Sequence, residues 1–536
     1  IVFNGEIFNY RNLRRQLKCD GEVFRSGTDT EVLLAGLARH GSAFLERLEG
    51  MFAFAFFDPR TPRLLLARDP LGIKPLYLAN TAGGGFAFAS EVRALLASGL
   101  VSKSLDRRGL AGFLAYGAVQ HPFTLFEGIS SLPPGTFQEV TAQQPTATAR
   151  GWVASEPQPF WRFPLVRADI HQREAIESVR ATLEAAVRDH LIADVPVGVF
   201  LSAGLDSTIV AALAARQSPQ IEAFTVGFSD YPNLSEMTLA ADTAARFGLR
   251  HVSINLPARE AEAAVTQWLA AADQPSIDGL NTFVISQAVR KYGIKVALSG
   301  LGADELFGGY PSFRDVPRLA RVARRMAWLP ATVRRGAAAV ATARKPRAVG
   351  RKLSDMMEGG GRLADIYFHR RRLLSDSEMA AFGMPPDALH LSADYQQPGL
   401  TEGLDESDAV RAVSELESRF YQGNMLLRDS DVMGMAHGLE IRVPFLDRRV
   451  LETVHALPGG VRRPPRVPGK YLLRSAFADL LRPELTDRPK TGFTLPLAQW
   501  MLGPMRDLCE RSLLACSESG ALPMAAVRRV WDEFPA

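Results

Sequence analysis

Residues 200–208 read FLSAGLDST and join a buried-strand pattern to a helical pattern. The mostly apolar run 197–201 predicts a strand, and the small residues after it predict a loop that exposes backbone N–H groups at a helix N-terminus. These N–H groups and the positive end of the helix dipole favour phosphate. Ser202 and Ser207 add hydroxyl donors, and the Asp206 carboxylate could hold magnesium on the phosphates. The stretch predicts a phosphate site, with a plain Ser/Gly turn as the alternative.

This loop differs from the phosphate loop of ordinary kinases and GTPases, because it lacks both the GxxxxGK(S/T) spacing and a lysine. It resembles the SGGxDS loop of ATP pyrophosphatases. Those enzymes cleave ATP to AMP and pyrophosphate while they adenylate a substrate.

A second loop of the same kind follows the strand-like run 295–298 and reads SGLGADELFGGY over residues 299–310. Strand-like runs alternate with helical patterns in this half of the chain, at 195–201, 221–228 and 295–298. The alternation predicts a parallel, doubly wound α/β sheet, which binds ligands at the carboxyl ends of its strands. Asp206 and Asp304, each just beyond a strand, could then share one Mg–pyrophosphate.

The first part of the chain, up to about residue 135, favours an α+β unit with mainly antiparallel sheets. We expect strands at 51–57, 63–67, 76–79 and 85–89, and helices at 28–40 and 91–97. Residues 141–164 are rich in Thr, Ala, Gln and Pro without a period, which suits a linker. Beyond residue 312 the pattern is mostly helical.

Composition narrows the class of protein. A length of 536 residues favours two or more domains, and contents of 47% hydrophobic and 22% charged residues are typical of a soluble globular protein. The net charge of +4 is small, and we interpret the basic stretch 318–352 as a solvated helical face. We therefore expect no nucleic-acid or membrane partner and allow for a homodimer, while small-molecule substrates are implied by the motifs described next. Three scattered cysteines favour a reducing, cytoplasmic setting.

Longer motifs make the whole chain resemble the glutamine-dependent asparagine synthetase family, class II amidotransferases with an N-terminal nucleophile. Besides the two loops, the matching segments are NGEIFNY at 4–10, SGTDTE at 26–31, GMFAFA at 50–55, ARDPLGIKPLY at 67–77, RDSD at 428–431, the family's helical segment MAHGLEIRVPFLD at 435–447, KYLLR at 470–474 and RPKTGF at 488–493. The resemblance implies two domains. Residues 1–165 would be a glutaminase of antiparallel sheets and helices, and residues 166–536 an ATP-pyrophosphatase-like parallel α/β synthetase domain with a helical C-terminal part.

The resemblance also implies roles for residues of the synthetase half. Pyrophosphate would be held by Ser202, Gly204, Asp206 and Ser207, and adenine and ribose would be framed by Leu201, Val226, Ser299 and Gly300. Asp206 and Asp304 would hold Mg²⁺ with the ATP. Lys470 would lie against the α-phosphate and neutralise charge as AMP is transferred, with a surface helix lysine as the alternative. For Glu440 and Arg442, an ion pair that organises the C-terminal helices is the alternative to substrate contact.

In the first half, the resemblance implies a glutaminase whose N-terminal cysteine attacks the glutamine amide. The Asn4 side chain and the Gly5 amide would form the oxyanion hole, and Glu6 and Asp29 would hold the glutamine backbone. No residue of this sequence can be the nucleophile. We therefore expect it before Ile1, in a chain truncated at its N-terminus.

The sequence departs from the family at two positions. Ala203 replaces a glycine of the first loop, so residue 203 must avoid a positive φ. Leu301 stands where asparagine synthetases usually carry an acidic residue, which leaves the substrate acid open. The first reading is an asparagine synthetase. The alternatives are a family member that amidates or cyclises another acid, and a non-catalytic nucleotide-binding scaffold.

Overall fold

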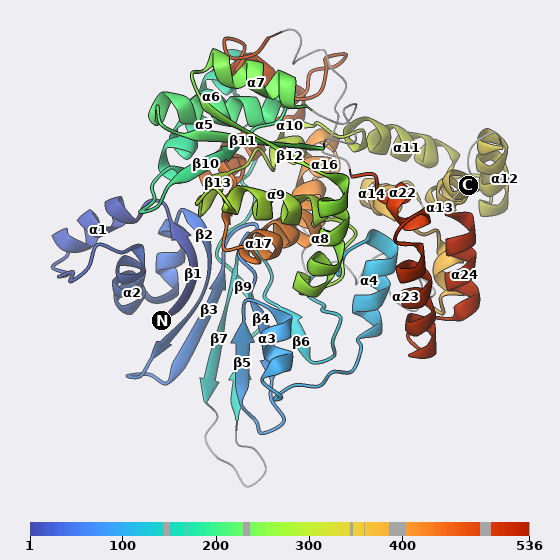
Figure 1. Ribbon diagram of the computed structural model, residues 1–536, viewed down its shortest axis with the longest axis horizontal. Helices are drawn as coiled ribbons and strands as arrows, with labels where there is room; N and C mark the ends of the chain where they lie inside the picture. The colour runs from blue at the N-terminus through green and yellow to red at the C-terminus, as the bar shows by residue number, and fades with distance from the viewer. Residues whose placement is uncertain are drawn as a thin grey trace.

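The computed structural model describes residues 1–142, 151–167, 169–228, 236–343, 347–358, 360–384, 404–482 and 495–534. Two antiparallel sheets form the N-terminal part, shown in blue and cyan in Figure 1. The larger contains β1 (Val2–Ile7), β2 (Gly50–Asp58), β3 (Arg63–Arg68), β7 (Thr136–Ala142), β8 (Trp152–Ala154) and β9 (Gln158–Pro159). The smaller contains β5 (Phe86–Ala89), β4 (Tyr77–Asn80) and β6 (Ile129–Ser131). The predicted α+β unit is confirmed.

The helical elements of this part are α1 (Tyr10–Cys19), α2 (Asp29–His40), η1 (Gly41–Arg47), α3 (Val92–Ala97) and α4 (Arg107–Tyr116). α2 begins at Asp29 because the Thr28 side chain accepts a hydrogen bond from the Glu31 amide, and two acids in the first turn suit the helix dipole. This cap places Asp29 beside the first strand. The prediction of a linker at 141–164 is wrong where the structure describes it, since β8 and β9 extend the sheet by pairing with β7. Residues 143–150 lie outside the described ranges.

A five-stranded parallel sheet forms the centre of the second half, in the order β12 (Arg250–Leu256), β11 (Glu222–Phe228), β10 (Val197–Phe200), β13 (Val296–Leu298) and β14 (Glu440–Arg442). Its helices include α5 (Gln172–His190), α6 (Leu205–Gln217), α7 (Met237–Arg246), α8 (Ala258–Ala271), α9 (Leu280–Arg290) and α10 (Ala303–Phe307). The chain leaves β10 toward β11 and later returns on its other side as β13. This reversal is a topological switch point, where open α/β sheets bind ligands.

The rest of the chain is mostly helical, as the sequence predicts. Its elements are α11 (Ser312–Met326), α12 (Ala331–Thr342), α13 (Arg347–Glu358), α14 (Leu363–Arg371), α15 (Asp376–Ala381), α16 (Ala409–Leu416), η4 (Glu417–Leu426), α17 (Leu427–Met435), η5 (Pro444–Leu446), α18 (Arg448–His455), α19 (Gly459–Arg462), α20 (Tyr471–Ala476), α22 (Leu497–Leu502), α23 (Arg506–Glu518) and α24 (Met524–Glu533). Within the described ranges, no helix is long and apolar enough to cross a membrane.

One prediction about this part needs correction, and another is largely confirmed. The segment 435–447 is not helical throughout, because Glu440–Arg442 form a strand that pairs in parallel with β13. The basic stretch 318–352 forms α11 to α13, and most of its described arginines are exposed, but Arg334 is buried. In Figure 1, α11 and α12 extend away from the parallel sheet toward the right of the view.

One hydrophobic core joins the two halves. Phe8, just beyond β1, and Met51 of β2 belong to the same buried cluster as Val199 of β10 and Ile441 of β14. A shared core fixes two elements relative to each other, because separating them would expose apolar surface to water. The first strand of the N-terminal part is therefore held close to the last strand of the parallel sheet.

Candidate active sites

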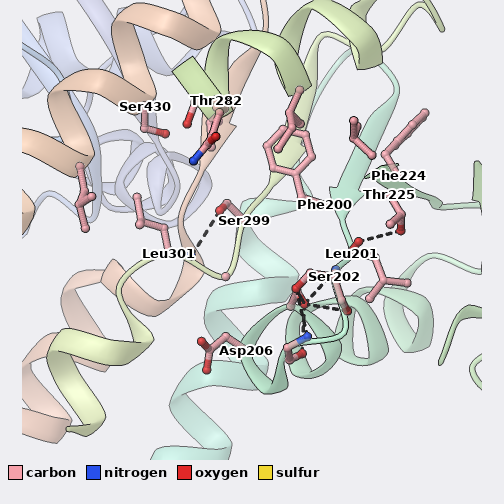
Figure 2. A pocket seen from close by; sticks show the side chains of 18 of the residues that line it. Phe200, Leu201, Ser202, Asp206, Phe224, Thr225, Thr282, Ser299, Leu301 and Ser430 are labelled. Carbon is pink, nitrogen blue, oxygen red and sulfur yellow. Dashed lines mark hydrogen bonds between the residues drawn. The ribbon is translucent and has the colours of Figure 1, made fainter. Parts of the chain in front are cut away.

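A cavity of about 440 Å³ opens at the carboxyl ends of β10 and β13 (Figure 2). The residues expected to bind pyrophosphate, adenine and ribose all line it, whereas Lys470 and Asp304 do not: the lining includes Leu201, Ser202, Gly204, Asp206, Ser207, Val226, Ser299 and Gly300. The structure thus brings together residues from three separate segments of the chain. Their binding roles stay predictions.

The first loop is preorganised by its own hydroxyl groups. The Ser207 hydroxyl accepts a hydrogen bond from the Ser202 amide at 3.1 Å and lies 2.8 Å from the Ser202 hydroxyl, which in turn accepts from the Gly204 amide. The Ala203 amide donates to the Glu236 carboxylate at 3.0 Å. A carboxylate therefore already binds one amide of this loop, as expected for a loop that attracts anions.

The two loops approach each other so closely that residue 300 has to be glycine. A Cβ at Gly300 would lie 2.9 Å from the Ser207 amide nitrogen and 3.0 Å from the Asp206 Cβ, and real Cβ atoms rarely come this near to backbone. A side chain at position 300 would push the second loop away from the start of α6. Gly300 thus allows Asp206 and the residues after β13 to face one cavity.

The two residues that depart from the family pattern, Ala203 and Leu301, lie differently with respect to the cavity. Ala203 does not have a positive φ, which confirms the expectation from its side chain. It is not among the residues that line the cavity, whereas Leu301 is. In Figure 2, Leu301 lies beside Ser299, with Asp206 below it in the view and Thr282 and Ser430 above it. Leu301 therefore faces the part of the cavity beyond the phosphate loop.

Lys470 connects the two predicted metal ligands. Its Nζ lies 2.6 Å from Asp206 Oδ2 and 2.7 Å from Asp304 Oδ1. Burial lowers the pKa of Lys470, but the two carboxylates outweigh that effect and hold the pKa above its usual range. Lys470 also adopts a left-handed backbone conformation (φ 61°), which costs energy in a non-glycine residue and has to be held by its surroundings. The alternative of a surface helix lysine is wrong, since only 13% of the side chain is exposed.

The residues present fit a magnesium ion that also binds phosphate oxygens. Asp206 and Asp304 supply hard carboxylate oxygens that converge on one point, the Lys470 ammonium. Within the described part of the chain, no group of three or more His, Cys, Asp or Glu side chains could hold a metal ion. Magnesium commonly takes one or two carboxylates and completes its shell with water and substrate phosphates.

Sequence reasoning missed several residues at the far end of the cavity, among them Asp278 and Asp429. Burial raises the pKa of Asp278 above its usual value, and it raises that of Asp429 to about 6. Arg428 lies 3.3 Å from the Asp429 carboxylate, and Ser276 donates a hydrogen bond to it. The motif at 428–431 was a signal for Asp429, although the motif alone gave it no role. Asp278 had only the weak signal of an Asp-Gly turn before a helix.

The four predicted glutamine-binding residues also lie together. Asn4, Gly5 and Glu6 belong to β1, and Asp29 accepts a hydrogen bond from the Ile7 amide at 3.0 Å. The Asn4 side chain donates to the Ser90 hydroxyl at 3.2 Å. Gly5 has φ 141°, and a Cβ there would clash with the Met51 carbonyl in β2, so the tight strand pairing needs glycine. Their roles in glutamine hydrolysis stay predictions.

Glu6 and Glu440 share one guanidinium, that of Arg442. Arg442 Nε donates to Glu440 at 2.7 Å, and Arg442 Nη2 lies 3.3 Å from Glu6. Glu440 and Arg442 thus form the ion pair that was one of the two alternatives for them, and substrate contact stays a prediction. Burial raises the pKa of Glu6 to about 7, although Arg442 acts against the shift. The motif expected at 488–493 lies outside the described residues.

Two family models match the chain. The model described as asparagine synthase matches residues 178–536, and the model described as a glutamine amidotransferase domain matches residues 1–179. The asparagine synthase match covers the phosphate loop, the second loop and Lys470. The other match covers Asn4, Gly5, Glu6 and Asp29.

Individual proteins are similar over nearly the whole chain. A Mycobacterium bovis protein, provisionally assigned as a glutamine-hydrolysing asparagine synthetase, is 35% identical over 99% of this chain and 80% of its own length. The Bacillus subtilis protein named glutamine-hydrolysing asparagine synthetase 1 is 30% identical over 95% of this chain and 77% of its own length. A Penicillium rubens protein named amidase chyE is 26% identical over 94% of this chain and 78% of its own length.

Proposed function

Because the chain belongs to the glutamine-dependent asparagine synthetase family, we propose that it is a glutamine-hydrolysing asparagine synthetase. It would use ATP to adenylate the side-chain carboxylate of aspartate and release pyrophosphate. Ammonia from glutamine would then attack the acyl carbon, so that asparagine and AMP leave. The observation that supports this most is the convergence of Asp206, Asp304 and Lys470 at the switch point of the parallel sheet. We also propose a cytoplasmic location from the cysteine usage and retain the division at residues 165 and 166. A homodimer stays a prediction.

In the synthetase half, the first loop would bind the pyrophosphate portion of ATP through its backbone amides and the Ser202 and Ser207 hydroxyls. The Glu236 carboxylate would leave the Ala203 amide as the phosphate arrives, since both anions need the same donor. Apolar Leu201 and Val226 would lie against adenine. The Lys470 ammonium would turn from the two aspartates toward the α-phosphate, where it neutralises charge that develops during transfer.

Asp206 and Asp304 would hold Mg²⁺, which when bound neutralises the charge of the phosphates and orients them for displacement. Lys470 has the same two carboxylates as its ion-pair partners. The lysine thus stabilises a buried pair of acids that would otherwise repel each other.

In the glutaminase half, the Asn4 side chain and the Gly5 amide would donate to the oxyanion formed when the nucleophile attacks the glutamine amide. Glu6 and Asp29 would hold the ammonium of the glutamine. Two carboxylates suit the binding of an ammonium, and β1 and the start of α2 bring Glu6 and Asp29 close to each other. A tight β1–β2 pairing keeps the Gly5 amide in a fixed direction.

A second candidate function is the amidation or cyclisation of a different carboxylic acid. Leu301 favours it, because a leucine facing the far end of the cavity can neither orient an ammonium nor accept a proton. Asp278 and Asp429 provide the carboxylates of that region instead. That a similar protein is named an amidase also fits a family with more than one substrate.

One experiment separates these functions. With ammonia in place of glutamine, release of pyrophosphate is measured with aspartate and with a panel of other carboxylic acids. Release with aspartate supports asparagine synthesis, and release with another acid alone supports the second candidate. Absence of release with every acid would contradict both and favour a nucleotide-binding scaffold.

A further inference from the structure

Arg442 is one of the most deeply buried charged side chains of the molecule. It ends β14 in the synthetase half, and 1% of it is exposed. Its Nη1 donates to the carbonyl oxygens of His190 and Ile192 at 2.8 and 2.6 Å, and its Nε donates to Glu440 at 2.7 Å. A planar guanidinium with acceptors in several directions is held in one orientation.

The remaining nitrogen of Arg442 points to the other half of the protein. Nη2 lies 3.3 Å from Glu6 Oε1, and the guanidinium carbon lies 5.6 Å from the centre of the Phe8 ring. Both residues belong to the first eight of the chain, at and just beyond β1. The carboxylate proposed to hold the glutamine ammonium is therefore anchored by an arginine from the synthetase half.

The backbone of the same residue reaches the nucleotide cavity. The Arg442 carbonyl accepts a hydrogen bond from the Ser299 amide at 2.8 Å, and Arg442 pairs with Leu298 in the parallel sheet. Ser299 lines the cavity proposed to bind ATP. One buried residue thus contacts a residue of each proposed site.

We propose that Arg442 is a positioning residue for glutamine hydrolysis and couples the glutamine site to the nucleotide cavity. The inference rests on the proposed function, since it takes Glu6 and Ser299 as binding residues. Glu6 has to be ionised and stationary to pair with an ammonium, and the adjacent guanidinium favours both. A nucleotide that moves the Ser299 amide also moves the Arg442 carbonyl. Such coupling is reciprocal, so glutamine would change nucleotide affinity by the same factor.

Four charged groups act on Glu6, and their signs allow a sharp test. Arg442 of β14 and Lys74 lower its pKa, whereas Glu440 of β14 and Asp29 of α2 raise it. Glutamine binding needs the ionised form, so kcat/KM for glutamine falls as pH decreases through the pKa of Glu6. Loss of the Arg442 charge should move this acid limb to higher pH, and loss of the Glu440 charge should move it to lower pH. A merely structural role would not give opposite shifts.

The test compares Arg442→Gln and Glu440→Gln in protein extended at its N-terminus to include the predicted nucleophilic cysteine. We expect limb shifts of about 1 pH unit in opposite directions, the usual effect of one charge at this distance. Arg448→Gln is the matched control. Arg448 also crosses between the halves, through Nη1 to the Glu46 carbonyl at 2.7 Å, but it does not contact Glu6. Its acid limb should stay in place.

Two further readouts complete the experiment. ATP with the acid substrate should change the KM for glutamine in the wild type, and Arg442→Gln should reduce this change. Pyrophosphate release with ammonia reports whether Arg442→Gln folds. If Arg442→Gln does not fold, the test rests on Glu440→Gln alone. An acid limb of the kcat/KM profile that does not move in Glu440→Gln then overturns the inference. Limbs that stay in place or move together in both variants also overturn it. Absence of glutamine hydrolysis in the wild type would instead contradict the proposed function itself.

Discussion

Replacement of Lys470 by alanine removes the ammonium that lies 2.6 Å from Asp206 and 2.7 Å from Asp304. We expect kcat for pyrophosphate release with ammonia to fall about 10²–10³-fold, or about 2.7–4 kcal/mol, the usual loss for one donor to a developing oxyanion. The loss should appear in kcat rather than in KM for the acid. The reason is that Lys470 contacts carboxylates in the resting protein and would meet the α-phosphate during transfer.

The same substitution should have the opposite effect on magnesium. Each charge-assisted hydrogen bond of Lys470 contributes about 1.5–3 kcal/mol, and an ion entering between Asp206 and Asp304 has to replace both. In Lys470→Ala this competition is gone, so the Mg²⁺ concentration for half-maximal activity should fall while kcat falls too. The assay is pyrophosphate release titrated with Mg²⁺ at saturating ATP and acid.

Arg466→Ala is the matched control for backbone strain. Arg466 has φ 66°, close to the 61° of Lys470, and it lies four residues earlier with an exposed side chain. Its substitution should leave kcat within about twofold of the wild type, because it removes a charge without touching the carboxylates. A Lys470→Ala enzyme with kcat within about threefold of the wild type would refute the assignment of Lys470.

Asp206→Ala should abolish pyrophosphate release but leave glutamine hydrolysis in the N-terminally extended protein, and loss of both activities would contradict separate sites. Gly300→Ala should raise the KM for ATP about tenfold or more, because its Cβ would lie 2.9 Å from the Ser207 amide; an unchanged KM would contradict the close approach of the loops. Asp447→Asn should lower the free energy of unfolding at pH 7 by about 1.5–3 kcal/mol. Burial raises the pKa of Asp447, but hydrogen bonds from Arg449 and His190 outweigh this and hold it well below its usual value. The stabilisation is therefore present above pH 4 and lost as pH falls below it, so denaturant unfolding should show a smaller difference at pH 3.

The loops that carry chemistry could be predicted from the sequence because their signal is local. FLSAGLDST contains its own strand end, hydroxyl groups and helix start, and the structure places Ser202, Asp206 and Ser207 in one cavity. The second loop, at 299–305, likewise contains a strand end, small residues and a helix start within a few residues. The membership of β10 and β13 in one parallel sheet followed from the alternating pattern, although their direct pairing did not.

Features that depend on distant pairing could not be predicted. β14 has three residues, too few to show a period, and it becomes a strand only because β13 lies beside it. β8 has three residues and β9 has two, so a stretch rich in Thr and Pro gave a linker pattern. The contact between Glu6 and Arg442 joins residues far apart in the chain, and nothing near either residue indicates the other. Asp278 likewise lines the cavity only because the fold brings its segment beside residues that are distant in the chain.

Activation of the acid as its adenylate leaves a signature in the transfer of one oxygen atom from the acid to AMP. The acid that gives the fastest pyrophosphate release is labelled with ¹⁸O in its carboxylate, and the nucleotide product is analysed by mass spectrometry after one turnover with ammonia. We expect AMP that carries one ¹⁸O atom, because the carboxylate oxygen stays on phosphorus when ammonia displaces AMP from the acyl carbon. ADP with the label in inorganic phosphate, or unlabelled AMP, would contradict it.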